Sequence, residues 1–258
     1  MARRLIVPGV TALEVWDLVV GDTTLFAAAR RRDFPALLAS ALRSLAAGTA
    51  RRASGLPIGP PGLQFEEVVV GGGGWDAIAT GRRPCAFGTV AGGRFVGAAG
   101  GLALLDGPGL VVDVGQTAVK VAWPGGRLLV ERDLRVLPVQ SRSTDPAHRS
   151  ALVEFIGGAI RRALALAPVP RRVVLALPAA LRRDGTPEGS SYPGMAGDVT
   201  LVADVLAFAA LADTDTLVLN DAELAALSAR LQARRRALVL TIGFGVGAAL
   251  LDVATAAR

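Results

Sequence analysis

An α/β fold with a duplicated architecture is the fold class that the sequence predicts, and two similar segments are its main support. In residues 110–123 an apolar run ends at Asp113, a Gly-Gln-Thr turn follows, and alternating apolar residues resume. Residues 237–253 repeat this strand–turn–strand pattern around a glycine-rich bend, TIGFGVG. Elsewhere, short apolar runs alternate with longer stretches at helical spacing, which is typical of α/β proteins.

The composition indicates a protein with a large apolar core. The 258 residues are 52% hydrophobic and 19% charged, which suffices for one large or two small domains. The net charge is +6, but the arginines form short clusters without interleaved aromatic residues, so we expect no nucleic-acid partner. The single Cys85 and the single His148 argue against a disulfide framework, a thiolate zinc cluster and a Ser-His-Asp triad.

The sequence contains no segment with the pattern of a signal peptide or a membrane span. The apolar N-terminal stretch is interrupted by Pro8, Glu14 and Asp17, and no small-residue cleavage site follows. The longest apolar region, residues 95–112, contains many glycines, an aspartate and a proline. We therefore expect a cytoplasmic protein that does not contact a membrane.

The first third of the chain is expected to contain two short strands and one helix. Residues 5–7 and 13–20 have strand patterns. Residues 33–47 carry apolar positions at helical spacing, with Pro35 near the first turn. The Pro/Gly segment at 55–62 is short, so we interpret it as a surface loop.

A glycine run and a glycine-rich helix precede the central segment. A strand at 65–70 leads into four glycines at 71–74, and a helix begins at 75–79. Bare backbone between a strand and a helix lets a phosphate or a flat ring approach the helix N-terminus, although a flexible turn is the alternative. Residues 92–105 are predicted to form a helix dense in Gly and Ala, which would need close approach to a neighbouring element.

The remaining elements alternate between strands and helices. Strands are expected at residues 127–132, 134–139, 173–177 and 216–219. Helices are expected at residues 150–167, 200–211 and 221–235. A long polar loop at 181–197 is a functional candidate, because long loops in compact domains are often functional.

The bend of the central segment carries groups that suit phosphate and metal binding. Asp113 ends a buried strand and could hold a hydrated Mg²⁺, which prefers one or two carboxylates plus phosphate oxygens. Gly115 lets backbone N–H groups approach an anion, and Thr117 adds a hydroxyl. An ordinary hairpin in which Asp113 caps the turn is the alternative. Lys120 either neutralises phosphate charge or faces solvent.

Three segments together resemble the actin, sugar-kinase and heat-shock ATPase superfamily. LVVDVGQTAVK looks like its first phosphate motif. TLVLNDAELAAL and the following ALVLTIGFGVGAALL resemble the catalytic Asn-Asp segment and second phosphate motif of the ROK family of glucokinase-like kinases. VVLALPAALRRDGTP lies where that family has an apolar strand, a proline and a sugar-contacting loop. The resemblance implies a two-domain, actin-like ATPase (ribonuclease H-like) fold with a nucleotide cleft between the domains.

The order of the motifs resembles that of a circular permutant. FEEVVVGGGGWDAI is similar to the adenosine motif and GGRFVGAAGGLALL to the hinge helix, yet both precede the first phosphate motif, whereas in the superfamily they come last. This implies a discontinuous nucleotide domain, residues 1–90 plus 206–258, and a phosphate-1 and substrate-side domain, residues 91–205. The strand near Leu5 should then extend the sheet of residues 248–253, which would make the two termini neighbours.

The resemblance implies an ATP-dependent kinase, a phosphotransferase that acts on a hydroxyl of a sugar or sugar-like small molecule, with ATP and Mg²⁺ as cofactors. Asp221 would be the general base and Asn220 would orient it or the substrate, with a helix N-cap as the alternative for both. Asp113 would hold Mg²⁺ through water. The residues implied to bind the nucleotide are Asp113, Gly115, Gln116, Thr117, Lys120, Thr241, Gly243, Gly245, Gly247, Gly72, Gly73 and Gly74.

The chain departs from the ROK pattern in its substrate-side features. It lacks the cysteine-rich zinc segment and the Glu-x-Gly-His motif, Tyr192 stands where the family usually has a sugar-contacting Asn, and Phe244 replaces a small hydroxyl residue. Two other functions stay open: a nucleotide-binding regulatory or assembly ATPase, and a degenerate pseudokinase that serves as a binding subunit. A homodimer is also left open, and the sequence does not name the acceptor.

Overall fold

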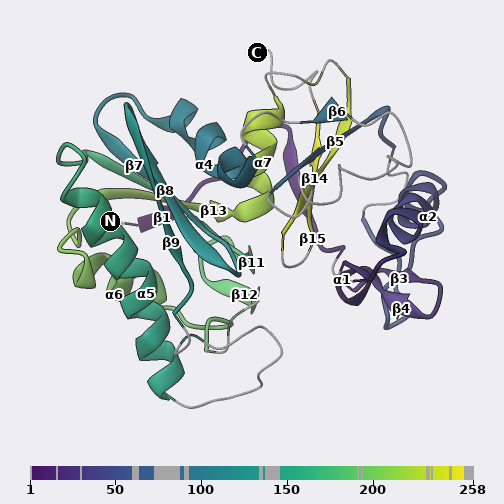
Figure 1. Cartoon of the computed structure of the whole chain (residues 1–258), viewed down its shortest axis with the longest axis horizontal. Coiled ribbons are helices and arrows are strands. Elements are labelled where there is room, and N and C mark those ends of the chain that lie inside the picture. Colours follow the sequence, from purple (N-terminus) through teal and green to yellow (C-terminus); the bar gives the residue numbers. More distant parts are fainter. Residues whose placement is uncertain are drawn as a thin grey trace. The chain divides into compact units, whose positions relative to one another are not determined.

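The computed structural model divides the chain into two compact units, each with its own sheet and apolar core (Figure 1). Unit 1 comprises Met1–Ile6 and Gly97–Leu224, and unit 2 comprises Val7–Val96 and Ala225–Arg258. The structure describes residues 2–15, 17–29, 31–59, 64–72, 88–89, 93–133, 136, 146–190, 192, 194–230, 233, 235–243 and 246–252. No helix in this described part of the chain is long and apolar enough to cross a bilayer.

Unit 1 is built on a six-stranded mixed sheet with the order β1-β13-β10-β7-β8-β9. The central strand β7 pairs parallel with β10 and antiparallel with β8. Strand β9 pairs antiparallel with β8, while β13 and β1 continue the parallel side. The strands are β1 (Ala2–Arg4), β7 (Gly109–Val114), β8 (Ala118–Trp123), β9 (Gly126–Glu131), β10 (Arg172–Leu177) and β13 (Asp215–Asn220).

Both faces of the unit 1 sheet are covered. Every residue of β7 is buried, which is why its sequence is a nearly continuous apolar run. Helices α5 (Pro146–Leu164) and α6 (Leu201–Phe208) share one apolar core with β7, β8 and β10. On α5 this core contains Leu152, Ile156 and Ala163, which lie on one helical stripe.

The opposite face of β7 is met by a short glycine-rich helix. A 3₁₀ turn (Gly93–Phe95), α4 (Val96–Gly101) and a second 3₁₀ turn (Leu102–Leu104) take the place of the helix predicted at 92–105. A Cβ at Gly101 would overlap the side chain of Val111 on β7, so the predicted close approach is confirmed.

Unit 2 is built on a five-stranded sheet with the order β2-β15-β14-β5-β6. Its core joins this sheet to α1 (Leu25–Ala28) and to α2 (Phe34–Ala46), whose Leu38, Leu42 and Leu45 form the apolar stripe that the sequence predicts. The strands are β2 (Val10–Leu13), β5 (Glu67–Gly71), β6 (Gly88–Thr89), β14 (Ala237–Ile242) and β15 (Val246–Leu251). A separate small hairpin is formed by β3 (Val19–Val20) and β4 (Thr23–Thr24).

The two sheets have the same order and directions of strands around one central strand. In unit 1, β8 pairs antiparallel with β7, and β9 pairs antiparallel with β8, while β10 and β13 run parallel to β7 on its other side. In unit 2, β15 pairs antiparallel with β14, and β2 pairs antiparallel with β15, while β5 and β6 run parallel to β14 on its other side. In unit 1 the chain forms these five strands in the order β7, β8, β9, β10 and β13, and the edge strand β1 has no counterpart in unit 2. In unit 2 the counterparts of the last three, β2, β5 and β6, precede the central pair β14 and β15.

Most predicted elements are present with small changes of length. The helices predicted at 33–47, 150–167 and 200–211 correspond to α2, α5 and α6. The strands predicted at 65–70, 127–132, 173–177, 216–219 and 237–240 correspond to β5, β9, β10, β13 and β14. The helix predicted at 75–79 lies outside the described residues, and of the strand predicted at 134–139 only residue 136 is described.

Three local predictions are wrong. Residues 13–20 do not form one strand, because β2 ends at Leu13 and β3 begins only at Val19, while Leu18 forms a separate bridge with Arg52. The helix α7 (Asp221–Ala229) ends before residue 235. The long polar loop at 181–197 contains part of a hairpin, in which β11 (Ala179–Leu181) pairs with β12 (Pro187–Ser190).

The strand predicted at residues 5–7 is also wrong, because β1 ends at Arg4, and so is the expected extension of the second sheet by this segment. Strand β1 pairs with β13 in unit 1, and Leu5 N donates to Val218 O at 2.8 Å. The strand that extends the sheet beside β15 is β2, whose Val10 and Leu13 are buried. Met1 and Arg258, which were expected to be neighbours, lie outside the described residues.

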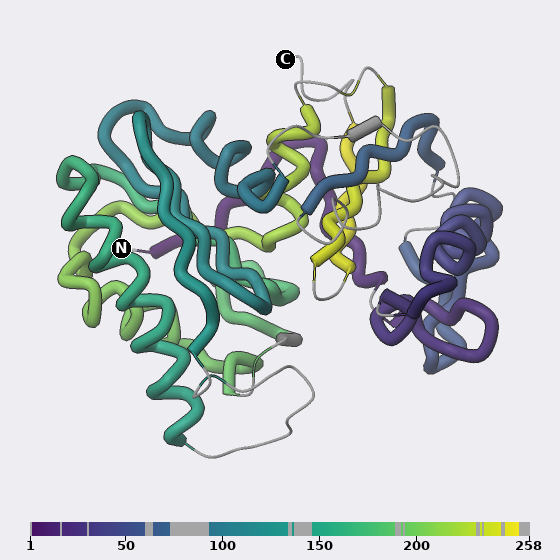
Figure 2. The backbone as a smooth tube through the Cα atoms, in the orientation of Figure 1, coloured from purple at the N-terminus to yellow at the C-terminus, as the bar shows by residue number. Residues whose placement is uncertain are grey.

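The division into units falls at residues 6–7, 96–97 and 224–225. Figure 2 follows the same chain as a tube coloured from the N-terminus to the C-terminus. The sequence instead placed the divisions after residues 90 and 205. Residues 215–220 fall in unit 1 because β13 pairs with β10 along its whole length, which joins it to the β7 sheet. Two of the three divisions in the structure lie within helices, α4 and α7.

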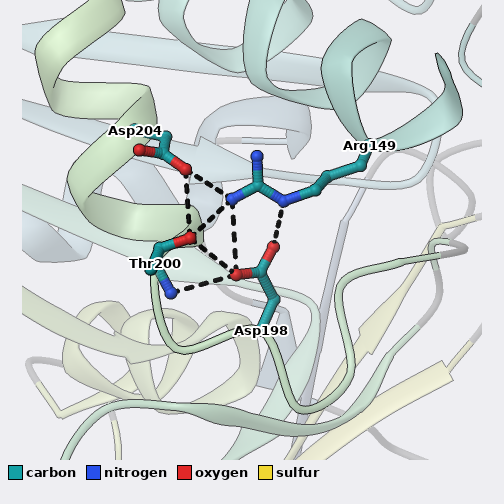
Figure 3. A network of polar contacts seen from close by, with 4 residues as sticks. All are labelled: Arg149, Asp198, Thr200 and Asp204. Atoms are coloured by element: carbon teal, nitrogen blue, oxygen red, sulfur yellow. Dashed lines mark hydrogen bonds and ion pairs between the residues drawn. The ribbon is translucent and has the colours of Figure 1, made fainter. Parts of the chain in front are cut away.

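A network of ion pairs and hydrogen bonds around Arg149 joins the start of α6 to the first turn of α5 (Figure 3). The Arg149 guanidinium donates to both carboxylate oxygens of Asp198, at 2.6 and 3.3 Å. It also donates to Thr200 Oγ1 at 2.8 Å and to Asp204 Oδ2 at 2.5 Å. Hydrogen bonds from Arg149 and then Thr200 lower the pKa of Asp204.

We expect Arg149→Met to lower the free energy of unfolding by about 1 kcal/mol, because the forked bond to a mostly buried carboxylate is lost. Urea titration at neutral pH measures this change. The loss should shrink below about pH 4. The pKa values of Asp198 and Asp204 are lowered in the folded protein, so their contribution to stability disappears as the two carboxylates become protonated. Arg182→Met is the control, because the Arg182–Glu188 pair is more than half exposed at both ends. Equal effects of the two substitutions would contradict a structural role for the network.

A matched pair of helix glycines tests the close approach of α4. A Cβ at Gly101 would lie 2.7 Å from Leu224 Cδ1 as well as against Val111, and both neighbours are fully buried. Gly101→Ala should therefore destabilise the protein by about 1–3 kcal/mol. Around Gly158, in the middle of α5, no described atom lies within 4 Å of the added Cβ. Gly158→Ala should stabilise by about 0.4–1 kcal/mol, and shifts of the same sign in thermal melting would argue against this packing.

Candidate functional site

A buried ion pair lies at the end of the central strand of unit 1. Asp113 on β7 and Lys120 on β8 are cross-strand partners, and Lys120 Nζ lies 3.1 Å from Asp113 Oδ2. The exposed fractions of the two side chains are 18% for Lys120 and 8% for Asp113. A carboxylate buried to this extent needs a counter-charge, which the ammonium supplies. Lys120 therefore does not face solvent, which was one of its two predicted placements.

The turn between these strands is held in place by neighbouring side chains. Gly115 N donates to Ala118 O at 3.0 Å, which closes the bend. Arg132 donates through its guanidinium to Gln116 O at 3.0 Å and through its backbone N–H to Thr117 O at 2.8 Å. The Thr117 residue is exposed at the tip. This turn presents its backbone and one hydroxyl in a fixed geometry, as a phosphate-binding bend requires.

Glycine is required at position 115 by its surroundings. A Cβ there would lie 2.9 Å from Lys120 Nζ and 3.1 Å from Ala118 O. The ammonium of Lys120 therefore lies between the carboxylate of Asp113 and the α-carbon of Gly115. This placement puts a positive charge directly at the bend that the sequence marks for phosphate.

Tyr192 forms a hydrogen bond to the same turn. Its side chain is buried, with 3% exposure, and its hydroxyl donates to Gly115 O at 2.5 Å. Burial raises the pKa of Tyr192, while the Arg132 guanidinium opposes the rise, so the phenol stays protonated and can donate. The resemblance places Tyr192 where a sugar-contacting Asn usually stands, but here the residue is part of the packed core.

Asn220 and Asp221 lie where β13 ends and α7 begins. Asn220 Oδ1 accepts a hydrogen bond from Ala222 N at 2.9 Å, and Glu223 Oε2 accepts one from Asn220 N at 2.9 Å. This reciprocal arrangement is a capping box. The second group of the amide, Asn220 Nδ2, donates to Ala179 O at 2.8 Å and so ties the β11–β12 hairpin to this corner. The N-cap alternative for Asn220 is therefore confirmed.

The carboxyl of Asp221 titrates close to neutral pH. Burial raises the pKa of Asp221 to about 7, and the nearby Asp113 carboxylate adds to the rise, whereas Lys120 and the Ala222 N–H oppose it. Part of the residue still reaches solvent. A carboxyl with a pKa near the working pH can accept a proton and release it again, as a general base must.

Helix α4 meets Asp113 through a glycine. A Cβ at Gly97 would lie 2.9 Å from Asp113 Oδ2 and 3.3 Å from Leu224 Cδ2. The small residue lets the helix backbone cover the carboxylate that the strand delivers. Gly97, Asp113 and Asp221 thus belong to one corner of unit 1.

Three of the other predicted phosphate and adenosine residues, Gly72, Thr241 and Gly247, lie together in unit 2. Gly71 pairs with Thr241 across β5 and β14, and Gly247 pairs with Thr241 across β14 and β15. Gly72 has φ +100° and approaches the backbone of Ile242 so closely that a Cβ would lie 2.5 Å from Ile242 O. The structure therefore brings Gly72, Thr241 and Gly247 to one end of this sheet.

Of the remaining predicted residues in these two glycine segments, the structure describes Gly243. Gly243 follows β14 and is exposed. Gly73, Gly74, Phe244 and Gly245 lie outside the described residues.

The carboxylates of unit 1 suit a hydrated Mg²⁺ better than a fully protein-bound one. Mg²⁺ usually takes one or two carboxylates and completes its shell with water and phosphate oxygens. Asp113 supplies one carboxylate, and within the described residues no group of three or more His, Cys, Asp or Glu could hold a metal. Because Lys120 already contacts one oxygen of Asp113, the chain's own residues would hold the ion mainly through water.

Three residues of this corner were not singled out from the sequence. Glu223 follows Asn220 by three positions, and this Asn-x-x-Glu spacing is a capping-box signal that could have revealed it. Arg132 and Arg4, which forms an ion pair with Glu223, carry no such signal, because their partners are distant in the chain.

No model of a protein family matches the chain, and no curated protein matches it. Among solved structures, the chain is similar to the inorganic polyphosphate/ATP-glucomannokinase from Arthrobacter sp. strain KM, with 21% sequence identity and a TM-score of 0.40. The similarity covers 57% of this chain and 59% of that chain. The function proposed below is therefore argued from the residues of the site.

The raised pKa of Asp221 predicts a pH-dependent gain in stability for Asp221→Asn. The folded state favours the protonated carboxyl, so the unfolded state binds fewer protons between about pH 4 and pH 7, and wild-type stability falls as pH rises through that window. The amide cannot ionise, yet its oxygen can still accept from Ala222 N. Asp221→Asn should therefore be more stable than wild type by a margin that grows up to about pH 7. Urea titrations of both proteins between pH 5 and 8 measure it, and a margin independent of pH would contradict the raised pKa.

Proposed function

We propose that this chain is an ATP-dependent kinase that phosphorylates a hydroxyl of a sugar or sugar-like small molecule. The observation that carries the proposal is the corner of unit 1 in which Asp221, with a pKa of about 7, lies near Asp113, Lys120 and a rigid glycine turn. Phosphoryl transfer depends mainly on positioning and charge neutralisation, and these groups supply both.

Asp221 is the proposed base. As a carboxylate it accepts the proton of the acceptor hydroxyl while the hydroxyl oxygen attacks the terminal phosphorus, and the bond from that phosphorus to the leaving phosphate breaks. Asn220 cannot serve freely as a substrate ligand, since its oxygen caps α7 and its amide nitrogen donates to Ala179 O. We therefore assign Asn220 to positioning Asp221.

The glycine turn and Lys120 are the proposed phosphate contacts. Gly115, Gln116 and Thr117 form the bend, and the ammonium of Lys120 lies beside Gly115. Asp113 is the proposed carboxylate for a hydrated Mg²⁺, which when bound would neutralise phosphate charge. The glycines of unit 2, Gly72 to Gly74 and Gly243 to Gly247, together with Thr241, remain our proposed nucleotide contacts.

We also propose that the chain is a circular permutant with a discontinuous second domain. The support is internal to the molecule: the five strands of unit 2 have the same spatial order as five of the six strands of unit 1, but the chain forms them in a different sequence. Joining the end of β15 to the start of β2 would restore in unit 2 the strand sequence of unit 1. Chain termini in compact domains tolerate such rearrangement.

A nucleotide-binding protein without an acceptor substrate is the second candidate. It is favoured by one observation, the ion pair in which Lys120 already neutralises Asp113. If this pair persists with nucleotide present, Asp113 would be less available to organise a metal for transfer.

Nucleotide binding is the first test. Mg-ATP or Mg-ADP at about one hundred times Kd should stabilise the protein by about 2.7 kcal/mol, which appears as a higher melting temperature. Asp113→Asn should weaken the Mg²⁺-dependent part of this shift. The absence of any shift with millimolar purine nucleotides would remove the support for both candidate functions.

Transfer is the second test, and it separates the two candidates. Asp221→Asn should keep the nucleotide-induced shift but lower turnover by about 10²-fold or more, the usual contribution of a general base. Turnover is measured with Mg-ATP against a panel of sugars, polyols and aminocyclitols. Full turnover in Asp221→Asn would show that the residue is not the base. If the wild-type protein phosphorylates none of the acceptors in the panel, the second candidate is favoured.

A further inference from the structure

The first strand of the chain contributes a buried charge to the corner that carries Asp221. Arg4 Nη2 donates to Glu223 Oε1 at 2.6 Å, although the two residues are 219 positions apart. The exposed fractions of the two side chains are 11% and 6%. Two charges this well buried are stable only as a pair with their remaining hydrogen bonds satisfied.

Glu223 connects this pair to the start of α7. Its second oxygen, Oε2, accepts the hydrogen bond from Asn220 N, and Asn220 Oδ1 accepts the one from Ala222 N. Asp221 Oδ1 also accepts from Ala222 N at 2.9 Å. The direction of the Asp221 carboxylate therefore depends on a turn whose hydrogen bonds end at the Arg4 guanidinium.

Arg4 is not needed to attach β1 to the sheet. The strand pairs with β13 through its backbone from Ala2 to Arg4, and Leu5 N continues the pairing with Val218 O. The neighbouring Arg3 lies on the same strand, but its side chain is 64% exposed. Its Nη2 lies 3.7 Å from Asp215 Oδ1, so its ion pair is long and open to solvent. The Arg4 guanidinium also donates through Nη1 to Leu5 O at 2.5 Å and to Val218 O at 3.4 Å, and its charged partner is Glu223 of the capping box.

We propose that Arg4 is a positioning residue for Asp221, acting through Glu223 and the capping box of α7. This inference rests on the proposed function, in which Asp221 is the base. A strand supplied by the opposite end of the sequence thereby sets the geometry of the Asn-Asp segment.

A double-mutant cycle tests the link. Arg4→Met leaves the Glu223 carboxylate buried without its cation, so the carboxylate should turn away and release Asn220 N. The hydrogen exchange of the Asn220 and Ala222 amides should then accelerate about tenfold, the effect of losing one hydrogen bond of this kind. Glu223→Gln keeps an oxygen that can accept from Asn220 N but needs no cation. Adding Glu223→Gln to Arg4→Met should therefore restore most of the protection.

The same variants separate positioning from general stability in kinetics. With Mg-ATP and the best acceptor of the panel, Arg4→Met should lower kcat by about 10²-fold, the size expected for a misplaced reacting group, and leave the KM for Mg-ATP unchanged. Arg4→Met/Glu223→Gln should recover most of kcat. Arg3→Met is the matched control on the same strand and should change neither kcat nor the amide exchange.

Each contrary result has a distinct meaning. If Arg4→Met leaves the two amides as protected as in wild type, or if Glu223→Gln rescues nothing, Arg4 does not act through the capping box and the proposal is wrong. If amide protection follows Arg4 but kcat does not, the capping box does not position a catalytic group and the proposal is again wrong. If the wild type turns over no nucleotide while amide protection follows Arg4, the proposed function fails and the structural link stands.

Discussion

A carboxylate at the end of a strand buried on both faces is the constraint on which unit 1 depends. Asp113 belongs to β7, whose every residue is buried, so its charge needs a partner within the protein. Lys120 supplies it across the strand pair, and Gly115 and Gly97 leave room for the ammonium and for the covering helix. Glycine in the turn and glycine in α4 thus follow from the same buried charge. The glycine-rich composition around this strand is a packing requirement as much as a sign of ligand binding.

The corner beside this pair holds two carboxyl groups in unequal surroundings. Asp113 forms an ion pair with Lys120, whereas burial and the nearby Asp113 raise the pKa of Asp221 to about 7. Keeping a carboxyl in such surroundings costs stability, and proteins usually tolerate this cost where a function needs it. The capping box formed by Asn220 and Glu223 fixes the position of the Asp221 carboxyl. The support for a catalytic role of Asp221 therefore comes from its environment and its placement together.

The two sheets share a spatial order of strands that the order of strands along the chain does not reveal. In each sheet the central strand begins an antiparallel meander on one side and has parallel strands on the other. A parallel pair needs a long crossover, while an antiparallel pair needs only a hairpin, so the hairpins β7–β8 and β14–β15 remain recognisable as local sequence patterns. The rest of each sheet is assembled from distant segments. In unit 2 these segments are strands at the beginning of the chain, which pair with strands at its end.

The sequence by itself determined the class of fold, most of the helices and strands, the two glycine hairpins and the residues Asp113, Asn220 and Asp221 as candidates, because periodicity, turns and caps are local properties. Only the tertiary structure decided that β1 joins β13, that β2 joins β15, that Lys120 neutralises Asp113 and that Arg4 pairs with Glu223. A short run such as ARR at residues 2–4 is compatible with the edge of either sheet. In the structure its backbone pairs with β13, and Arg4 reaches Glu223, which lies 219 positions away in the chain. Contacts between residues this far apart leave no local pattern in the sequence.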